Sequence, residues 1–206
     1  MEKKTTETSS EMVYEGFNKV FKKTYDQEGK TINREVMSGY NGVAGIVYDT
    51  EKEKYIFVKQ FRAGAESDMI EVVAGMLDNE HETPEEALKR EIIEEIGYKV
   101  DHMKHLKDFY VSPGKLSEVC SLFYVEVSEK VSEGGGEGDE NIEIIEVDYL
   151  GSNGDLFWNP DVENKIYQPP YQIIDAKTII AVNIMETNRL MKDMADVLTQ
   201  AKLRSL

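Results

Sequence analysis

The sequence predicts an α/β (α+β) protein in which a mixed β-sheet lies between helices, preceded by an N-terminal β-hairpin. Segments of strand length and segments of helical periodicity are interleaved along the chain, a pattern that favours a sheet covered by helices. Of the 206 residues, 40% are hydrophobic, which is ample for a core, and no internal repeat or linker is present. We therefore expect a β extension over residues 1–40 and one domain over residues 41–206.

The charge of the chain excludes two classes of partner. Asp and Glu number 40 against 24 Lys and Arg, a net charge of −16, whereas nucleic acids and anionic membranes need a basic surface. An anionic small molecule remains compatible, because bound cations invert the local field. The single cysteine, Cys120, cannot form an internal disulfide. The first twelve residues lack the apolar core of a signal peptide, and no apolar run of about 18 residues follows, so we expect a cytoplasmic protein.

The N-terminal part has the pattern of a hairpin. Residues 1–11 are polar and are expected to be frayed. Residues 13–25 and 31–37 have strand composition and flank a turn signal, Asp-Gln-Glu-Gly, at residues 26–29.

The remaining elements follow in order around one central helix. Six segments are predicted as strands: residues 42–49, 54–62, 69–74, 106–111, 118–127 and 142–147. The acidic, glycine-rich residues 132–140 are expected to bury no surface and to form a mobile loop. Residues 151–171 contain three of the five prolines and are expected to be irregular. From Asp175 onward, apolar residues recur at helical spacing and predict a long amphipathic helix.

The central helix has clear borders. Thr83 is suited to the N-cap, Pro84 to the first helical position, and Glu86 to the position that completes a capping box. Gly97 is expected to end the helix in the left-handed conformation. The predicted helix therefore covers residues 84–96.

Two arcs of this helix differ in character. At about 100° per residue, one arc carries three carboxylates, which belong to Glu91, Glu94 and Glu95. A neighbouring arc is apolar and is expected to face the core: Leu88, Ile92, Ile93 and Ile96. Like charges at this spacing cost a helix about 0.2–0.5 kcal/mol per pair, and a divalent cation with oxygen ligands would remove the repulsion. The alternative is an acidic face exposed to solvent.

The surroundings of the carboxylates resemble the Nudix box. The matching residues are Gly75, Glu82, and the run from Arg90 through Gly97 to Tyr98. Between Gly75 and Glu82 the chain has one residue more than the usual pattern, so Glu80 is an alternative to Glu82. The resemblance implies the Nudix α-β-α sandwich and an enzyme that hydrolyses a nucleoside diphosphate linked to another group.

The same resemblance implies roles for individual residues. Glu91 and Glu95 would be the principal ligands of Mg²⁺, with Mn²⁺ as the alternative ion. Glu94 would assist them, and the carbonyl of Ala74 would be a further ligand. Arg90, a catalytic residue in this scheme, would hold the carboxylates by charged hydrogen bonds.

Features outside the box resemble the ADP-ribose and sugar-nucleotide pyrophosphatases. The residues that this likeness assigns to substrate binding are Arg62, Glu71, Pro113 and Glu118. The glycine-rich loop occupies the position at which this group carries a catalytic Glu, for which we favour Glu140 over Glu137; a base at Glu94 is the competing alternative. The triple glycine beside Asp139 looks most like the GDP-mannose pyrophosphatase branch.

The resemblance thus implies a reaction and an assembly. The expected activity is Mg²⁺-dependent hydrolysis of a nucleoside diphosphate sugar, of the GDP-mannose or ADP-ribose class, to a nucleoside monophosphate and a sugar phosphate. The N-terminal extension resembles a dimerising segment and implies a homodimer. Two alternatives are a catalytically silent module that senses sugar nucleotides and a purely structural acidic protein.

Overall fold

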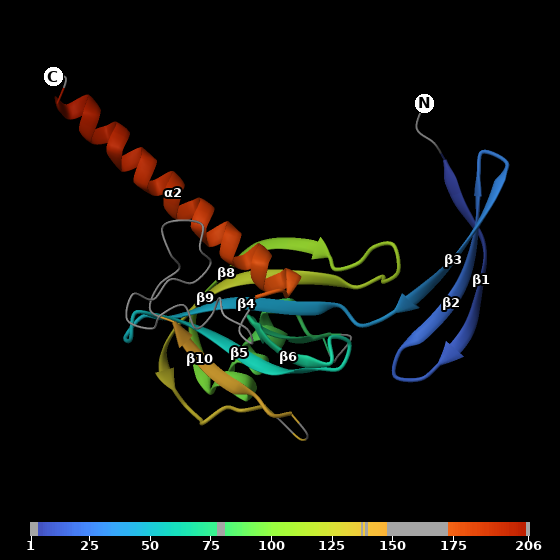
Figure 1. Ribbon diagram of the computed structural model, residues 1–206, viewed down its shortest axis with the longest axis horizontal. Helices are drawn as coiled ribbons and strands as arrows, with labels where there is room; N and C mark the ends of the chain where they lie inside the picture. The colour runs from blue at the N-terminus through green and yellow to red at the C-terminus, as the bar shows by residue number, and fades with distance from the viewer. Residues whose placement is uncertain (1–3, 78–80, 137, 139, 148–172, 205–206) are drawn as a thin grey trace.

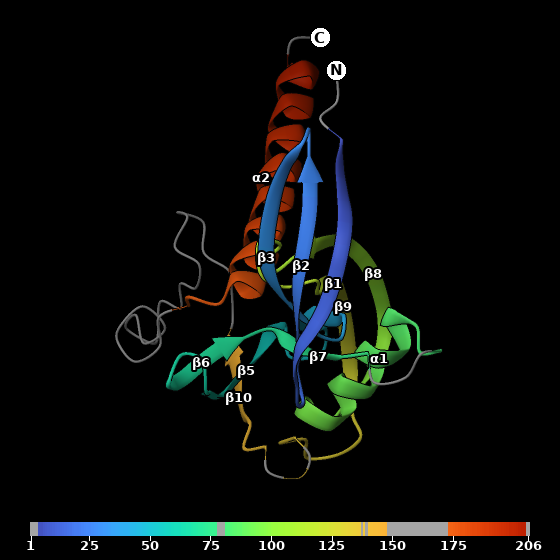
Figure 2. The ribbon, with the colours of Figure 1, turned by 90° about the vertical axis from the view of Figure 1, so that its right-hand side faces the viewer.

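The structure is a computed structural model that describes residues 4–77, 81–136, 138, 140–147 and 173–204. A small sheet of three N-terminal strands stands apart from a larger sheet, which helices cover on both faces (Figures 1 and 2). This is the mixed α/β architecture predicted from the sequence.

Seven strands form the large sheet: β4 (Gly42–Asp49), β5 (Lys54–Arg62), β6 (Ser67–Glu71), β7 (Val73–Met76), β8 (Tyr98–Tyr110), β9 (Val119–Lys130) and β10 (Glu143–Val147). The order is β10-β5-β4-β9-β8, with β6 paired to β5 and β7 paired to β4. The pair β4–β9 is parallel and the other pairs are antiparallel. The sheet is therefore mixed, as predicted.

The two faces of the sheet carry separate cores because strand side chains alternate. On β4, Val43 and Val47 face the layer formed by helix α1 (Pro84–Glu91) and the π-helical turn η1 (Ile92–Ile96). Ala44 and Ile46 of the same strand face helix α2 (Ala176–Arg204). The buried strand predicted at residues 42–49 is thus the centre of a three-layer sandwich.

The N-terminal segment differs from the predicted hairpin. It forms three strands, β1 (Thr5–Glu15), β2 (Lys19–Gln27) and β3 (Lys30–Ser38). The prediction that residues 1–11 are frayed is therefore wrong for residues 5–11, and residues 1–3 lie outside the described residues. The predicted strand over residues 13–25 is interrupted by a turn in which the Gly16 N–H donates to the Asn18 carbonyl (3.1 Å). Every residue of β1 is exposed, and residues 5–11 are all polar, so the sequence of this part did not indicate a strand.

Long-range contacts account for two further differences in the large sheet. The predicted strand at residues 69–74 breaks at Val72, whose N–H donates to the Thr178 hydroxyl of α2 (2.9 Å) instead of to a strand. Strand β8 begins at Tyr98, well before the predicted residue 106, because its polar first half pairs with β9 at the edge of the sheet. Residues 151–171, expected to be irregular, lie outside the described residues.

The central helix has the predicted borders. The Thr83 hydroxyl accepts from the Glu86 N–H (3.3 Å), and the Glu86 carboxylate accepts from the Thr83 N–H (2.9 Å), so the capping box is present. Gly97 ends the helix with φ of 78°. The last turn is a π-helix, a form often found at functional sites. Because Ile92 and Ile96 fill the inward side of that turn, Ile93 is 42% exposed, and its predicted core position is wrong.

Helix α2 confirms the long amphipathic helix predicted near the C-terminus. Its first turns pack on the sheet through Ala181 and Val182, and its second half projects away from the sheet (Figure 1). Leu190, Met191 and Met194 are exposed there. Among the helices in the described ranges, neither is both long and apolar enough to cross a membrane.

Candidate active site

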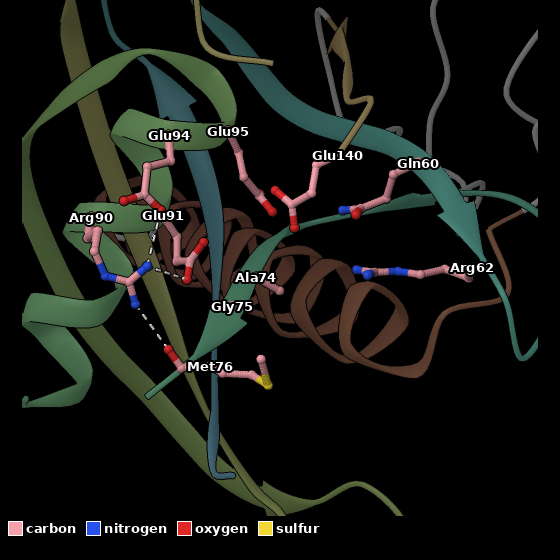
Figure 3. Close-up of a pocket in the computed structure, with 10 residues that line it drawn as sticks. All are labelled: Gln60, Arg62, Ala74, Gly75, Met76, Arg90, Glu91, Glu94, Glu95 and Glu140. Carbon is pink, nitrogen blue, oxygen red and sulfur yellow. Dashed lines mark hydrogen bonds and ion pairs between the residues drawn. The ribbon is translucent and has the colours of Figure 1, made fainter. Parts of the chain in front are cut away.

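A cavity of about 580 Å³ opens between β5, β7, the end of the central helix and the loop before β10 (Figure 3). Seven of the residues predicted from the sequence line it: Arg62, Ala74, Arg90, Glu91, Glu94, Glu95 and Glu140. Gln60, Gly75 and Met76 complete the wall. Residues separated by up to 80 positions in the sequence therefore meet around one space.

Arg90 holds the acidic residues of the helix in place. Its guanidinium donates to the carboxylates of Glu91 (2.8 Å) and Glu94 (3.1 Å). It also donates to Glu82 (3.2 Å) and to the Met76 carbonyl (3.2 Å) at the end of β7. Arg90 thus joins the helix to the loop that precedes it and offsets part of the carboxylate repulsion.

Glu95 is the most buried of the three carboxylates. It is 3% exposed, and its Oε2 has no hydrogen-bond partner. Burial raises the pKa of Glu95 to about 8, the negative charge of Glu91 adds to the rise, and a hydrogen bond from the Ala74 backbone opposes it. A carboxylate in this position is costly to ionise without a nearby positive charge.

The residues present fit a divalent cation. The side-chain donors at the helix are carboxylate oxygens, which Mg²⁺ prefers. Glu95, whose Oε2 has no hydrogen-bond partner, lines the same cavity as Glu91 (Figure 3). Gly75 leaves room for this arrangement, since a Cβ there would overlap the Glu91 carboxyl group. Within the described ranges, no three acidic, imidazole or thiol side chains are already gathered closely enough to enclose an ion. Glu91 and Glu94 point to Arg90 instead.

Arg62 lines the side of the cavity opposite the helix and is fixed by a carboxylate outside the lining. Its Nε and Nη2 donate to the two carboxylate oxygens of Glu71 (2.7 and 2.8 Å). Glu71 is 1% exposed and also accepts from Lys177 of α2 (3.2 Å), which in turn pairs with Asp175 (2.8 Å). Glu71, predicted to bind substrate, therefore lies behind Arg62 and outside the cavity lining.

Glu71→Gln is expected to lower the free energy of unfolding by about 3 kcal/mol, because it removes the charge of a buried carboxylate that pairs with two partly buried cations, Arg62 and Lys177. Denaturant unfolding of the variant measures the loss. Glu143→Gln is the matched control, since Glu143 pairs with Lys59 while its side chain is 61% exposed, and it should cost less than about 1 kcal/mol. Equal losses in the two variants would contradict the importance of the Glu71 network.

Pro113 and Glu118 lie elsewhere. Pro113 is exposed in the turn before β9, where the Lys115 N–H donates to the Ser112 carbonyl (2.9 Å). The same turn contacts the N-terminal sheet through the Met37 N–H and the Lys115 carbonyl (2.8 Å). Neither residue lines the cavity, so their substrate-binding roles stay predictions.

Glu140 reaches the cavity from the glycine-rich loop. Its carboxylate points to that of Glu95 (Figure 3), and the negative charge on Glu140 contributes to the raised pKa of Glu95. Glu137, the second choice for the base, lies outside the described residues. Both candidates for the general base thus line the same cavity, Glu140 from the loop before β10 and Glu94 from the central helix.

Comparison with known proteins identifies the family. The profile of the NUDIX domain matches residues 40–161. GDP-mannose pyrophosphatases of Escherichia coli K12 and of Shigella boydii serotype 4 are each 33% identical over 181 residues, with 82% of this chain and 87% of the relative covered. The chain belongs to the Nudix family. A crystal structure described as an ADP compounds hydrolase superposes with a TM-score of 0.69 at 18% identity, covering 93% of this chain and 96% of that one, and confirms the Nudix fold.

The Nudix box explains how the active site is assembled. The chain is a Nudix pyrophosphohydrolase, and Nudix hydrolases generally use divalent metal ions. The extra residue of its box falls between Gly75 and Glu82, and residues 78–80 of that stretch, Glu80 included, lie outside the described residues. Glu82, which directly precedes the N-cap Thr83, accepts a hydrogen bond from Arg90. The inserted residue therefore leaves this contact in place.

Two residues that line the cavity, and one that supports it from behind, gave different signals in the sequence. Gln60 and Arg62 lie on one face of β5, because strand side chains alternate, and Phe61 is 61% exposed on the other face. The alternation therefore placed Gln60 beside Arg62, although the sequence analysis assigned no role to Gln60. The Nε2 of Gln60 is buried without a partner at the cavity. Lys177 had no signal, because 106 positions separate it from Glu71.

Proposed function

We propose that this Nudix enzyme hydrolyses the pyrophosphate bond of a nucleoside diphosphate sugar in the presence of Mg²⁺, releasing a nucleoside monophosphate and a sugar phosphate. One observation carries the proposal: the three acidic residues of the helix and Arg62 line opposite sides of one cavity (Figure 3). Such a cavity can take a diphosphate between a cation site and a fixed guanidinium. Its volume also suits a nucleotide-sized ligand.

Each side chain has a defined task in this proposal. Glu91 and Glu95 would hold the metal ion, assisted by Glu94 and the Ala74 carbonyl, with Mn²⁺ as the alternative to Mg²⁺. The ion, when bound, neutralises charge on the phosphate oxygens. Arg62 binds the diphosphate by charged hydrogen bonds.

Glu140 acts as the general base. It takes one proton from a water molecule, whose oxygen bonds to phosphorus as the bridging P–O bond breaks. The leaving group, which is the phosphate ester on the other side of the broken bond, keeps the bridging oxygen. Arg90 stays outside the bond changes and orients Glu91 and Glu94.

GDP-mannose is the preferred substrate in this proposal, and ADP-ribose is second. The preference rests on the two relatives at 33% identity, which are GDP-mannose pyrophosphatases. The protein described as an ADP compounds hydrolase shares only 18% identity and supports the fold alone. A cytoplasmic location stays a prediction.

A turnover screen tests the substrate class. GDP-mannose, ADP-ribose, a dinucleoside diphosphate and GTP are supplied with Mg²⁺, and phosphate-containing products are quantified. We expect the highest kcat/KM for GDP-mannose. A higher kcat/KM for GTP than for every diphosphate sugar would refute the proposed class.

The silent sensing module is the alternative function. A Nudix protein that binds without cleaving would be expected to lack metal carboxylates, whereas Glu91, Glu94 and Glu95 are all present and meet one cavity. The same screen separates the two, since a sensor would bind GDP-mannose without releasing product.

Mg²⁺ is expected to stabilise the folded protein by mass action, because the ion binds the native carboxylates and not the unfolded chain. Raising free Mg²⁺ to several millimolar should increase the Tm of the wild type. Glu91→Gln, which removes one ligand charge, should show a smaller increase. A Tm that does not respond to Mg²⁺ in the wild type would argue against the metal site.

We also propose that the N-terminal sheet joins two copies of the chain. Large apolar side chains are exposed on β1 and the following turn: Met12, Val13, Tyr14 and Phe17. Sedimentation equilibrium should give twice the chain mass for the wild type and the chain mass for Val13→Lys/Phe17→Lys. Met191→Lys, on the exposed part of α2, is the control and should remain dimeric. A monomeric wild type would exclude this assembly.

A further inference from the structure

The glycine-rich segment Gly134–Gly136 contacts the end of the carboxylate helix. The last carbonyls of a helix lack partners within it. Here the Gly135 N–H donates to the Glu95 carbonyl (2.8 Å), and the Gly136 N–H donates to the Glu94 carbonyl (3.1 Å). The expectation that this segment buries no surface is therefore wrong, since Gly134, Gly135 and Gly136 are half-buried. The loop is a cap for the two residues whose side chains enter the active site.

The close approach of loop and helix requires glycine. A Cβ on Gly134 would lie 2.7 Å from the Glu95 carbonyl oxygen and 2.7 Å from the Ile96 carbonyl carbon, distances that non-bonded atoms do not adopt. Its φ of 71° also favours glycine. On the helix side, a Cβ on Gly97 would overlap the Ser132 carbonyl. Glycines on both sides of the contact bring the two backbones together.

The other end of the segment fixes Glu140. The Gly135 carbonyl accepts from the Ile142 N–H (3.2 Å), and the Ile142 side chain is buried in the core beneath α1. A Cβ on Gly136 would lie 2.7 Å from the Glu140 Cβ, so this glycine leaves the space in which Glu140 sits. Glu140 is thus held between an anchor on the helix and an anchor in the core.

We infer that Gly134–Gly136 are positioning residues: by capping the helix at Glu94 and Glu95, they set the position of Glu140 relative to the carboxylates of that helix. The inference rests on the proposed role of Glu140. A displacement of about 1 Å at a reacting group can cost roughly 10²-fold in rate, so a cap of this kind has a direct catalytic consequence.

The test is a double-mutant cycle between Gly134→Ala and Glu140→Gln. In the wild-type background, Gly134→Ala should lower kcat about 10–100-fold and change KM less than about 3-fold. In the Glu140→Gln background it should lower kcat less than about 3-fold, because the group that it displaces no longer acts. Equal losses in both backgrounds would overturn the inference. Gly138→Ala is the control for the backbone strain alone: Gly138 also has a positive φ, of 61°, but open space around it, so kcat should fall far less than in Gly134→Ala.

Amide hydrogen exchange gives a readout that does not depend on turnover. The Gly135 and Gly136 amides should be protected in the wild type, in Gly138→Ala and in Glu140→Gln, and should lose protection in Gly134→Ala. If Gly134→Ala does not fold, Gly136→Ala takes its place in the cycle, because its methyl group meets the Glu140 side chain instead of the helix backbone. Unprotected wild-type amides would refute the cap. If the wild-type protein leaves every nucleotide sugar intact, the proposed function is refuted. The hydrogen-exchange result would still show whether Gly134–Gly136 cap the helix.

Discussion

Glu95→Gln should lower kcat by several orders of magnitude and leave the fold intact. The substitution removes a ligand charge from the cation site without a change in shape. Steady-state kinetics at saturating Mg²⁺ measure the loss, and Glu85→Gln, on the exposed side of the same helix, is the control and should keep wild-type turnover. Near-normal turnover of Glu95→Gln at saturating Mg²⁺ would rule out Glu95 as a principal ligand.

The same variant should change how the stability of the metal-free protein depends on pH. Glu95 has a folded-state pKa of about 8, against an ordinary value of 4.5. Between these values the folded state binds more protons than the unfolded state, so the free energy of unfolding falls as pH rises. Denaturant unfolding without metal should therefore show a loss from pH 5 to about pH 8 in the wild type that is reduced in Glu95→Gln. Identical pH profiles would contradict the buried state of this carboxyl group.

Glu140→Gln should reduce kcat about 10²–10⁴-fold with little change in KM. The amide has nearly the same volume as the carboxylate but cannot accept the proton from water. Glu137→Gln, in the same loop, should be nearly silent. Kinetics of both variants under identical Mg²⁺ concentrations measure the difference.

Glu94→Gln distinguishes a general base at Glu140 from a general base at Glu94. Glu94 already accepts a hydrogen bond from Arg90 (3.1 Å), so we expect it to act through the metal and Arg90. If Glu140→Gln keeps its activity and Glu94→Gln loses activity with Mg²⁺ affinity intact, the base lies on the helix.

The sequence was most informative where local rules determine structure. Thr83, Glu86 and Gly97 have local conformational preferences, so the borders of the helix could be predicted. The buried strand β4 has an apolar run that packs on both faces. The clustering of the three carboxylates follows from their spacing on one helix. The π-helical form of the last turn had no local signal in the sequence.

The missed features depend on contacts between distant segments. Residues 5–11 of strand β1 are polar, and among the described residues this strand pairs with β2 alone, so nothing in their composition distinguished them from a frayed end. The Val72 N–H is diverted to Thr178, and Lys177 meets Glu71, because α2 crosses the sheet at that point. Such partners become visible only when the chain is folded.

The identity of the reaction products tests the central claim most directly. GDP-mannose is incubated with the wild-type protein and Mg²⁺, and the products are resolved by ³¹P NMR. We predict GMP and mannose 1-phosphate in equal amounts, with both signals abolished by EDTA and in Glu95→Gln. GDP with free mannose would show cleavage of the glycosidic bond and would contradict a pyrophosphatase, as would intact GDP-mannose after prolonged incubation.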